Sequence, residues 1–360
     1  MDDVYKRLAR RLDELPNGFP STKSGVELKI LQKIFTPDEA EMTLKIRPIP
    51  ETVEAIAERL GKPVPEMQAI LDNLVVKGQI GSLKIAGQRM YLLLPFVIGI
   101  FELQVNRMDE ELARLFDEYE PEFVKAVGRF DPPVARVVPV NQQIDAELHV
   151  HRYEDVRRMV DEAKSFELNE CICRKERALL GEGCGHMLEA CLSFSNEEGE
   201  YDRYARGKTI SKEEALKVIA DAEAEGLVHC TYNVQHGQIF LCNCCGCCCG
   251  LLRSIKKFKV PSMLAKSNFV ASIDQQTCIA CGVCANERCP MEAIVEEDGV
   301  YRVLVERCIG CGVCTSTCPT ESITLVRKPE GESGKPPANL VDWYFKRAAS
   351  RGIDIKMDAD

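Results

Sequence analysis

The chain lacks a long hydrophobic run. The longest apolar stretch, Met90 to Phe101, has 12 residues, whereas a membrane-spanning helix needs about 20, so this stretch favours a buried strand. The amino terminus, Met1 to Lys6, also lacks the apolar segment of a secretory signal peptide. These two absences predict a cytoplasmic protein without a transmembrane segment.

An excess of basic residues is missing too. The formal net charge is −10, which disfavours non-specific binding to nucleic acid. One basic segment contains Arg253, Lys256, Lys257 and Lys259. Two interpretations of it stay open: a solvated helix face, or a counter-charge for anionic clusters and a docking place for an acidic redox partner.

Cysteine, in contrast, is abundant, with 19 residues in 360. Without a signal peptide, this number indicates metal ligation in a reducing compartment rather than disulfides. Eight of them form two tandem runs: Cys278, Cys281, Cys284 and Cys289 before Pro290, and Cys308, Cys311, Cys314 and Cys318 before Pro319. Zinc sites need four ligands and use separate pairs of cysteines, so two complete runs indicate iron–sulfur chemistry.

These runs resemble the bacterial ferredoxin domain that holds two [4Fe-4S] clusters, over about Asn268 to Arg327. In that family, three thiolates of a run bind one cluster and the fourth binds the other. The resemblance implies one cluster held by Cys278, Cys281, Cys284 and Cys318, and a second held by Cys308, Cys311, Cys314 and Cys289. The spacing from Cys284 to Cys289 is one residue longer than usual, and we expect a small loop to absorb it.

Eleven cysteines (19 minus 8) precede these runs. Cys171 and Cys173 are predicted to lie on the same side of a strand, and Cys184 and Cys191 complete a set of four. We hypothesise one or two further iron–sulfur clusters, the second of unusual form, with ligands drawn from ten cysteines: Cys171, Cys173, Cys184, Cys191, Cys242, Cys244, Cys245, Cys247, Cys248 and Cys249. Buried structural cysteines are the alternative. His186 is the best candidate for a ligand other than thiolate.

The amino-terminal 105 residues contain four helical stripes and then a hairpin. The stripes begin at Val4, Val26, Val53 and Met67, and the hairpin covers residues 80–85 and 88–94. This order resembles a winged-helix domain. The helix that would enter a DNA groove presents Glu66 and Asp72, which repel phosphate, so we expect docking of a protein rather than of DNA. Residues 108–130 are predicted as a helix interrupted at Pro121.

The whole chain is predicted to be an α+β protein of several domains. Four parts follow one another: a winged-helix-like docking domain (1–105), a mixed α/β Cys-rich domain with the extra cluster site (106–265), the two-cluster ferredoxin domain (266–328), and a linker with a terminal helix (329–360). Residues 156–171 and 215–230 align without a gap as two helix–strand units. Trp343 either packs on the chain's own surface or serves as a contact for a partner. His149 and His151 are interpreted as polar surface.

The layout resembles a group of uncharacterised ferredoxin-type proteins of anaerobic bacteria and archaea. The matching residues are Glu170 to Arg174, Cys242 to Gly250 and the eight ferredoxin cysteines. This resemblance implies cluster binding and single-electron transfer, as a subunit or accessory of an anaerobic redox complex rather than as a stand-alone enzyme. We expect redox protein partners, such as a flavoprotein or another iron–sulfur oxidoreductase subunit. Two alternatives are a reductase with a substrate-binding cluster within residues 171–249, and a redox-sensing winged-helix transcription regulator.

Overall fold

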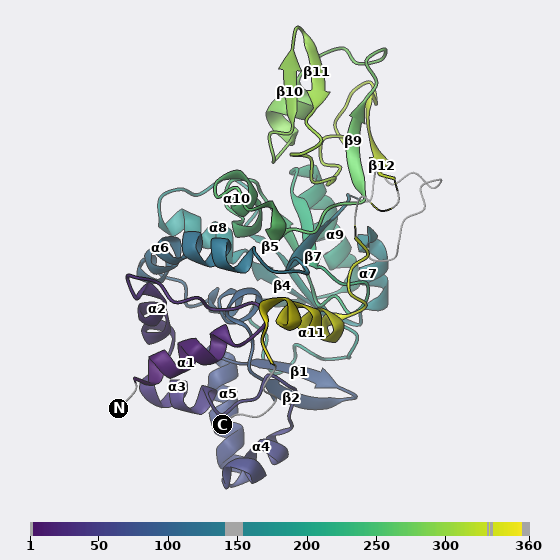
Figure 1. Ribbon diagram of the computed structural model, residues 1–360. Helices are drawn as coiled ribbons and strands as arrows, with labels where there is room; N and C mark the ends of the chain where they lie inside the picture. The colour runs from purple at the N-terminus through teal and green to yellow at the C-terminus, as the bar shows by residue number, and fades with distance from the viewer. Residues whose placement is uncertain (1–2, 141–153, 330, 332–333, 355–360) are drawn as a thin grey trace.

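The computed structural model describes residues 3–140, 154–329, 331 and 334–354. Figure 1 shows three parts in a row: helices and a hairpin at one end, a large sheet flanked by helices in the middle, and two small sheets at the other end. The chain is therefore a mixed α+β protein, as the sequence predicts. The pair His149 and His151 lies outside the described residues.

The described amino-terminal residues form five helices and a hairpin. They are α1 (Val4–Asp13), α2 (Val26–Ile34), α3 (Pro37–Thr43), α4 (Val53–Leu60), α5 (Val64–Val76), β1 (Gly81–Ile85) and β2 (Gln88–Leu92). Helix α3 is absent from the sequence-based prediction, because seven residues are too few to show a helical period. A capping box starts it instead: the Glu39 backbone N–H donates to the Thr36 side chain, and the Thr36 N–H donates to the Glu39 carboxylate.

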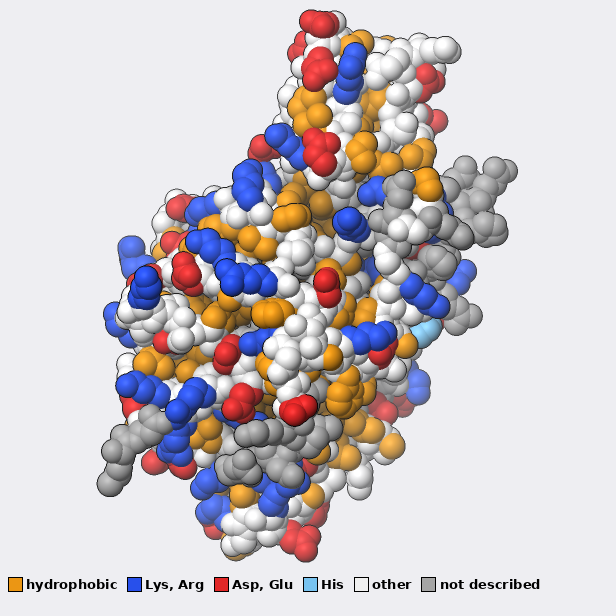
Figure 2. Space-filling model, viewed as in Figure 1, with side chains coloured by type: hydrophobic (Ala, Val, Ile, Leu, Met, Phe, Trp, Pro, Cys, Tyr) orange, Lys and Arg blue, Asp and Glu red, His pale blue; other side chains and the backbone are white. Residues whose placement is uncertain are grey.

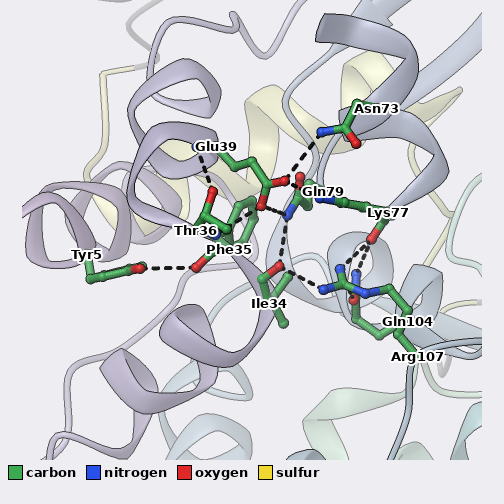
Figure 3. A network of polar contacts seen from close by, with 10 residues as sticks. All are labelled: Tyr5, Ile34, Phe35, Thr36, Glu39, Asn73, Lys77, Gln79, Gln104 and Arg107. Atoms are coloured by element: carbon green, nitrogen blue, oxygen red, sulfur yellow. Dashed lines mark hydrogen bonds and ion pairs between the residues drawn. The ribbon is translucent and has the colours of Figure 1, made fainter.

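Glu39 also joins α3 to the end of α5 (Figure 3). Its carboxylate accepts hydrogen bonds from Gln79 Nε2 at 2.8 Å and from Asn73 Nδ2 at 3.3 Å, and it pairs with Lys77. Gln79 Nε2 also donates to the Ile34 carbonyl at the end of α2, at 2.8 Å. One carboxylate is therefore the centre of a network that holds three helices together.

The β1–β2 hairpin and the polar face of α5 lie against the middle of the chain. The N–H groups of Ala86 and Gly87 donate to the Glu197 carboxylate at 3.0 and 3.1 Å. On α5, Asp72 pairs with Arg203 at 2.8 Å. The order of helices and hairpin is the one expected of a winged helix, although that assignment stays a prediction. A winged-helix domain would use helix α5 and the β1–β2 hairpin to bind DNA, and here both elements contact other residues of the same chain.

Helix α6 (Glu110–Val127) connects this part to the sheet. It continues through Pro121, whereas the sequence predicts an interruption there. Proline inside a helix costs about 3 kcal/mol. Burial of Phe116, Tyr119 and Phe123 along one face of α6 offsets that penalty.

The apolar run from Met90 to Phe101 is not one strand. Strand β2 ends at Leu92, and Pro95 has no N–H with which to continue a ladder. The chain turns there, and the Phe101 N–H donates to the Phe96 carbonyl at 2.7 Å. No helix in the described part of the chain is long and apolar enough to cross a membrane.

A six-stranded antiparallel sheet forms the middle of the molecule, in the order β3-β7-β8-β5-β4-β6. Its strands are β3 (Ala135–Val138), β4 (Ser165–Glu170), β5 (Glu189–Ser195), β6 (Lys208–Ile210), β7 (Val228–Tyr232) and β8 (Phe240–Cys244). Helices α7 (Val156–Glu162) and α9 (Lys212–Ala224) pack on this sheet and on each other. The predicted helix–strand units correspond to α7–β4 and α9–β7. Helix α8 (Ile172–Leu179) begins right after β4, so Cys173 lies in a helix and not in the predicted strand.

The last part of the chain contains two small antiparallel sheets. One pairs β9 (Phe269–Ile273) with β12 (Ile323–Arg327), and the other is the predicted hairpin of β10 (Ile294–Glu297) and β11 (Val300–Val303). Residues Cys284–Arg288 form a π-helical turn, in which the Cys289 N–H donates to the Cys284 carbonyl at 3.0 Å. A π turn holds one residue more than an α turn. This turn, rather than a loop, therefore takes up the extra residue of the first cysteine run.

Helix α11 (Leu340–Arg351) returns to the amino-terminal part (Figure 1). Trp343 is 2% exposed, and its Nε1 donates to the Pro133 carbonyl at 2.9 Å. Arg347 is also buried, and it donates to the carbonyls of four residues: Pro16, Val127, Phe130 and Pro132. Of the two interpretations of this helix, the structure has Trp343 packed on the chain's own surface.

The basic segment does not form one exposed face. Arg253, which lies in α10 (Gly250–Lys256), is buried and pairs with Glu120 of α6 at 2.9 Å. Lys256 pairs with Glu292 at 2.7 Å. On the face seen in Figure 2, Lys and Arg side chains are interspersed with Asp and Glu. Two cations of the segment therefore serve contacts within the chain.

Candidate metal centres

Two cavities in the last part of the chain are each lined by four cysteines. The outer set, around a cavity with about 350 Å³ of empty space, consists of Cys278, Cys281, Cys284 and Cys318. The inner set, around about 340 Å³, consists of Cys289, Cys308, Cys311 and Cys314. Each set takes three thiols from one run and the fourth from the other. The structure thus brings together the residues that the sequence analysis assigns to each of two clusters.

The two sets differ in exposure. Cys281 of the outer set is exposed, whereas Cys311 and Cys314 of the inner set are buried. Burial raises the pKa of Cys311 to about 12, so this thiol ionises at neutral pH only beside a bound cation. Four thiols around one cavity are the donor set that a cubane requires. Both sets therefore fit the predicted clusters.

The π turn also fixes the inner set to the middle of the chain, because the turn ends at Arg288. This guanidinium donates to the carbonyls of Glu223 and Ala224 at the end of α9, at 3.0 and 2.9 Å. It also donates to Ser316 Oγ at 3.2 Å. Cys289 of the inner set is the next residue. The turn that absorbs the longer spacing therefore also supplies a contact to the sheet domain.

Seven upstream thiols form one group, which we call the thiol ring. Three of its members stand side by side on neighbouring strands: Cys191 of β5 pairs with Cys242 of β8, and Cys242 pairs with Cys230 of β7. Such cross-strand partners point to the same face of a sheet. Cys230 is not among the predicted ligands. Its alignment with Cys171 in the two helix–strand units is the sequence signal that points to it.

The other side of the ring comes from the starts of two helices. Cys171 is the residue directly before α8, and Cys249 is the residue directly before α10. Contacts between thiols close a circle in the order Cys171, Cys173, Cys249, Cys244, Cys242, Cys191 and back to Cys171, with Cys230 joined to Cys244. Hydrogen bonds from ring neighbours lower the pKa of Cys242 to about 6. This shift favours the thiolate, which is the form that binds metal.

The four remaining thiols form a separate set, which we call the thiol quartet: Cys184, Cys245, Cys247 and Cys248. All four sulfurs lie within 4.8 Å of one another. The sequence analysis groups Cys184 with ring residues, whereas the structure places it in the quartet, because the loop between α8 and β5 turns it toward the segment 245–248. His186, the candidate for a ligand other than thiolate, has its Nδ1 3.3 Å from Glu225 Oε2.

Arg174 lies between the ring and the quartet. Its buried guanidinium donates to the carbonyls of Met187 and Asn243 at 2.8 and 2.7 Å. Its charge acts on Cys171 of the ring and on Cys245 of the quartet. A hydrogen bond within the quartet lowers the pKa of Cys245 to about 4; burial opposes this shift and the charge of Arg174 contributes to it. One cation therefore offsets negative charge in both groups of thiols.

The thiol ring adjoins the inner set. Cys230 and Cys311 belong to the same buried apolar cluster. Nearby, Gly246 packs on Pro290, and a Cβ on this glycine would lie 2.3 Å from the Pro290 carbonyl oxygen. The thiols thus succeed one another from the outer set through the inner set to the ring, and the quartet lies beside the ring.

Comparison with known proteins supports the assignment of the last part of the chain. Residues 271–325, which include both the outer and the inner set, match the family described as the 4Fe-4S dicluster domain. No curated protein and no solved structure matches the chain. The chain is therefore an iron–sulfur protein with a ferredoxin-like dicluster domain. The match does not extend to the thiol ring or to the quartet.

Proposed function

We propose that the chain is an electron-transfer protein in which two [4Fe-4S] clusters lead to a further iron–sulfur centre in the thiol ring. The observation that carries this proposal is the succession of thiols from the outer set through the inner set to the ring. Clusters of this type take up and release single electrons. The chain supplies the ligands, excludes water from the inner set and the ring, and fixes the order of the sites.

The exposure of the outer set supports a place for the redox partner. Cys281 is exposed, and the neighbouring Ile279 is 63% exposed, so another protein can approach the outer cluster closely. The inner set has no such access, since Cys311 and Cys314 are buried. We therefore propose that a redox protein, such as a flavoprotein or another iron–sulfur oxidoreductase subunit, docks at the outer set in an anaerobic redox complex.

The content of iron and acid-labile sulfide tests the centre in the ring. Two cubanes alone correspond to about eight iron atoms per chain, and we expect about 12 to 16 after anaerobic purification. The expected paramagnetic spectrum of the reduced protein contains cubane signals. A folded, fully reconstituted protein with only eight iron atoms would exclude the centre in the ring, and one without cubane signals would exclude electron transfer by this route.

We propose that the chain is divided into domains at residues 1–105, 106–265, 266–328 and 329–360. The first of these domains is proposed to be a docking scaffold. Its hairpin contacts Glu197 and its helix α5 contacts Arg203. These contacts favour a role within the protein over the DNA-binding alternative. Absence of binding to DNA at about 0.15 M salt, in both the oxidised and the reduced state, is the expected result.

A second candidate function is reduction of a substrate at the ring. The observation that favours it is Glu102, whose carboxylate accepts from the Gly99 N–H at 2.7 Å and lies near Cys242 and Cys249. Burial raises the pKa of Glu102 to about 8, so the carboxyl keeps its proton at neutral pH and is able to donate it. Turnover of small substrates by dithionite-reduced protein, lost in Glu102→Gln, would favour the reductase over the carrier.

A further inference from the structure

We propose that the thiol quartet holds a single tetrahedral metal ion, zinc(II) or iron(II), and not a polynuclear cluster. The four ligands are Cys184, Cys245, Cys247 and Cys248. This inference is independent of the proposed electron transfer, because it depends only on the geometry of these four side chains.

The spacing of the sulfurs is the first argument. Four thiolates at about 2.3 Å from one tetrahedral ion have their sulfurs about 3.8 Å apart. The Cys184 sulfur lies 3.6 Å from that of Cys248 and 3.9 Å from that of Cys245, and the sulfurs of Cys247 and Cys248 are 3.8 Å apart. The sulfurs therefore already stand where a single ion would hold them.

A cubane requires a wider set of ligands. Its four irons occupy separate corners and each carries one thiolate, so the thiolate sulfurs lie farther apart than they do around one ion. In neither the outer nor the inner set do three thiols lie within 4.8 Å of one another. Among the described residues, which include every cysteine, the quartet is the one group with three or more thiols within 4.8 Å of one another. The same chain thus has two kinds of four-cysteine site.

The quartet also supplies all four ligands of a tetrahedral ion. Four thiolates complete a tetrahedral coordination and leave no position for a substrate, as in structural zinc sites. Cys245 and Cys248 are buried, and the Arg174 guanidinium beside Cys245 offsets part of the negative charge of a tetrathiolate.

The position of the quartet gives the ion a structural role. It would join the loop that contains Cys184 to the segment 245–248. The residues on either side of that segment, Cys244 and Cys249, belong to the ring. An ion in the quartet therefore holds two ring ligands in place without itself exchanging electrons with a substrate.

X-ray absorption on the full chain, purified anaerobically, tests the proposal without any substitution. We expect one zinc ion per chain with four sulfur neighbours at about 2.3 Å and no metal neighbour. Protein from zinc-depleted, iron-rich cultures should contain one iron atom per chain in excess of its acid-labile sulfide. Protein from cobalt-supplemented cultures should show the visible absorption bands of a cobalt(II) tetrathiolate. These arms distinguish the two ions. Absence of a mononuclear tetrathiolate ion in all three preparations overturns the proposal.

Two exposed cysteines give a matched pair of variants. Cys247 belongs to the quartet and Cys281 to the outer set. Cys247→Ser should lose one metal ion per chain and no acid-labile sulfide, with the signals of the dicluster domain unchanged. Cys281→Ser should alter those signals and keep the ion. Loss of about four irons together with sulfide from Cys247→Ser, or no loss of metal at all, contradicts a single ion. If Cys247→Ser does not fold, the absorption spectra of the unsubstituted chain decide.

Discussion

At the scale of single residues, Arg174 has the widest influence on the candidate metal centres. Its two carbonyl contacts connect the loop of Cys184, through Met187, to strand β8, through Asn243. Its charge lies near thiols of both the ring and the quartet. Groups that orient metal ligands in this way contribute to the affinity for the metal.

Arg174→Met removes the charge and both hydrogen bonds. We expect the affinity for metal in the middle of the chain to fall about 10- to 100-fold, measured as metal retained during anaerobic titration with a chelator. Lys175→Met is the matched control, because Lys175 follows in α8 and pairs with Glu170 at the surface. Equal retention of metal in the two variants would show that Arg174 has no part in binding.

Glu39 leads to a prediction about acid stability. Burial acts to raise its pKa, but hydrogen bonds from Lys77, Thr36 and Gln79 outweigh burial and lower the pKa from 4.5 to about 2. The lowered pKa stabilises the folded chain above pH 4.5, and this contribution is lost as the pH falls from about 4.5 to about 2. Glu39→Gln should therefore reduce the free energy of unfolding by about 1–3 kcal/mol at pH 7 and by much less near pH 2.

Chemical unfolding at pH 7, 5 and 3, followed by circular dichroism, measures this difference. Glu66→Gln is the control, because Glu66 is half exposed and its pair with Lys62 is a surface pair. A difference between the unsubstituted chain and Glu39→Gln that stays constant over this pH range would contradict the assignment.

The abundance of cysteine predicted metal ligation, but it did not predict how the cysteines are divided between the thiol ring and the thiol quartet. Cys244 and Cys245 are adjacent, yet one belongs to the ring and the other to the quartet, because neighbouring side chains leave an extended backbone on opposite sides. Cys230 has no other cysteine beside it in sequence, and only the pairing of β7 with β8 brings it to the ring. Cross-strand register is a property of the folded sheet, so spacing along the chain does not reveal it.

At the scale of structural elements, two short segments hold the dicluster domain against the sheet. The π turn Cys284–Arg288 places Arg288 on the end of α9. The segment around Gly246 packs on Pro290, which follows a cysteine of the inner set. Both contacts lie next to thiols, so a change in either is expected to affect the inner set as well as the junction.

Gly246→Ala tests this junction. The added Cβ would lie 2.3 Å from the Pro290 carbonyl oxygen, so the backbone must shift, at a cost of about 1–3 kcal/mol. We expect faster hydrogen exchange in residues 289–293 and a lower unfolding temperature. Gly334→Ala is the control, since a Cβ there meets no atom within 4 Å. Unchanged exchange in Gly246→Ala would mean that the two parts do not depend on this contact.

Helices with a clear apolar period and the hairpin with its turn residues were predicted from the sequence, and elements without such a signal were not. The four predicted amino-terminal helices and the β10–β11 hairpin show their apolar pattern or their turn residues in the sequence. Helix α3 depends on the capping box at Thr36, and α8 has only eight residues, directly after Cys171. The π turn follows from an inserted residue between two fixed cysteines. None of these three features produces a periodic signal.

At the scale of the whole molecule, α11 joins regions that are far apart in sequence. Arg347 donates to the carbonyls of Pro16, near the amino terminus, and of Val127, at the end of α6. It also donates to the carbonyls of Phe130 and Pro132 at 2.7 Å. The predicted division into domains stays a prediction, and long-range contacts such as these appear only in the folded chain.

Arg347→Met should release α11 and lower the free energy of unfolding by about 2–5 kcal/mol, because four carbonyls lose their donor and two of these hydrogen bonds are buried. Thermal unfolding and limited proteolysis of residues 334–354 measure the effect. Lys346→Met is the control, since Lys346 forms a surface pair with Asp342 at 2.9 Å. Equal protease resistance in the two variants would show that Arg347 does not anchor the helix.

The division of one eight-residue stretch, Cys242 to Cys249, between two sites has a consequence for maturation. Cys242, Cys244 and Cys249 face the ring, whereas Cys245, Cys247 and Cys248 face the quartet. Filling either site immobilises backbone that the other site also needs, so the second cofactor is inserted into a partly ordered template. Biogenesis of the two centres should therefore be cooperative, and half-loaded molecules should be scarce among newly assembled protein.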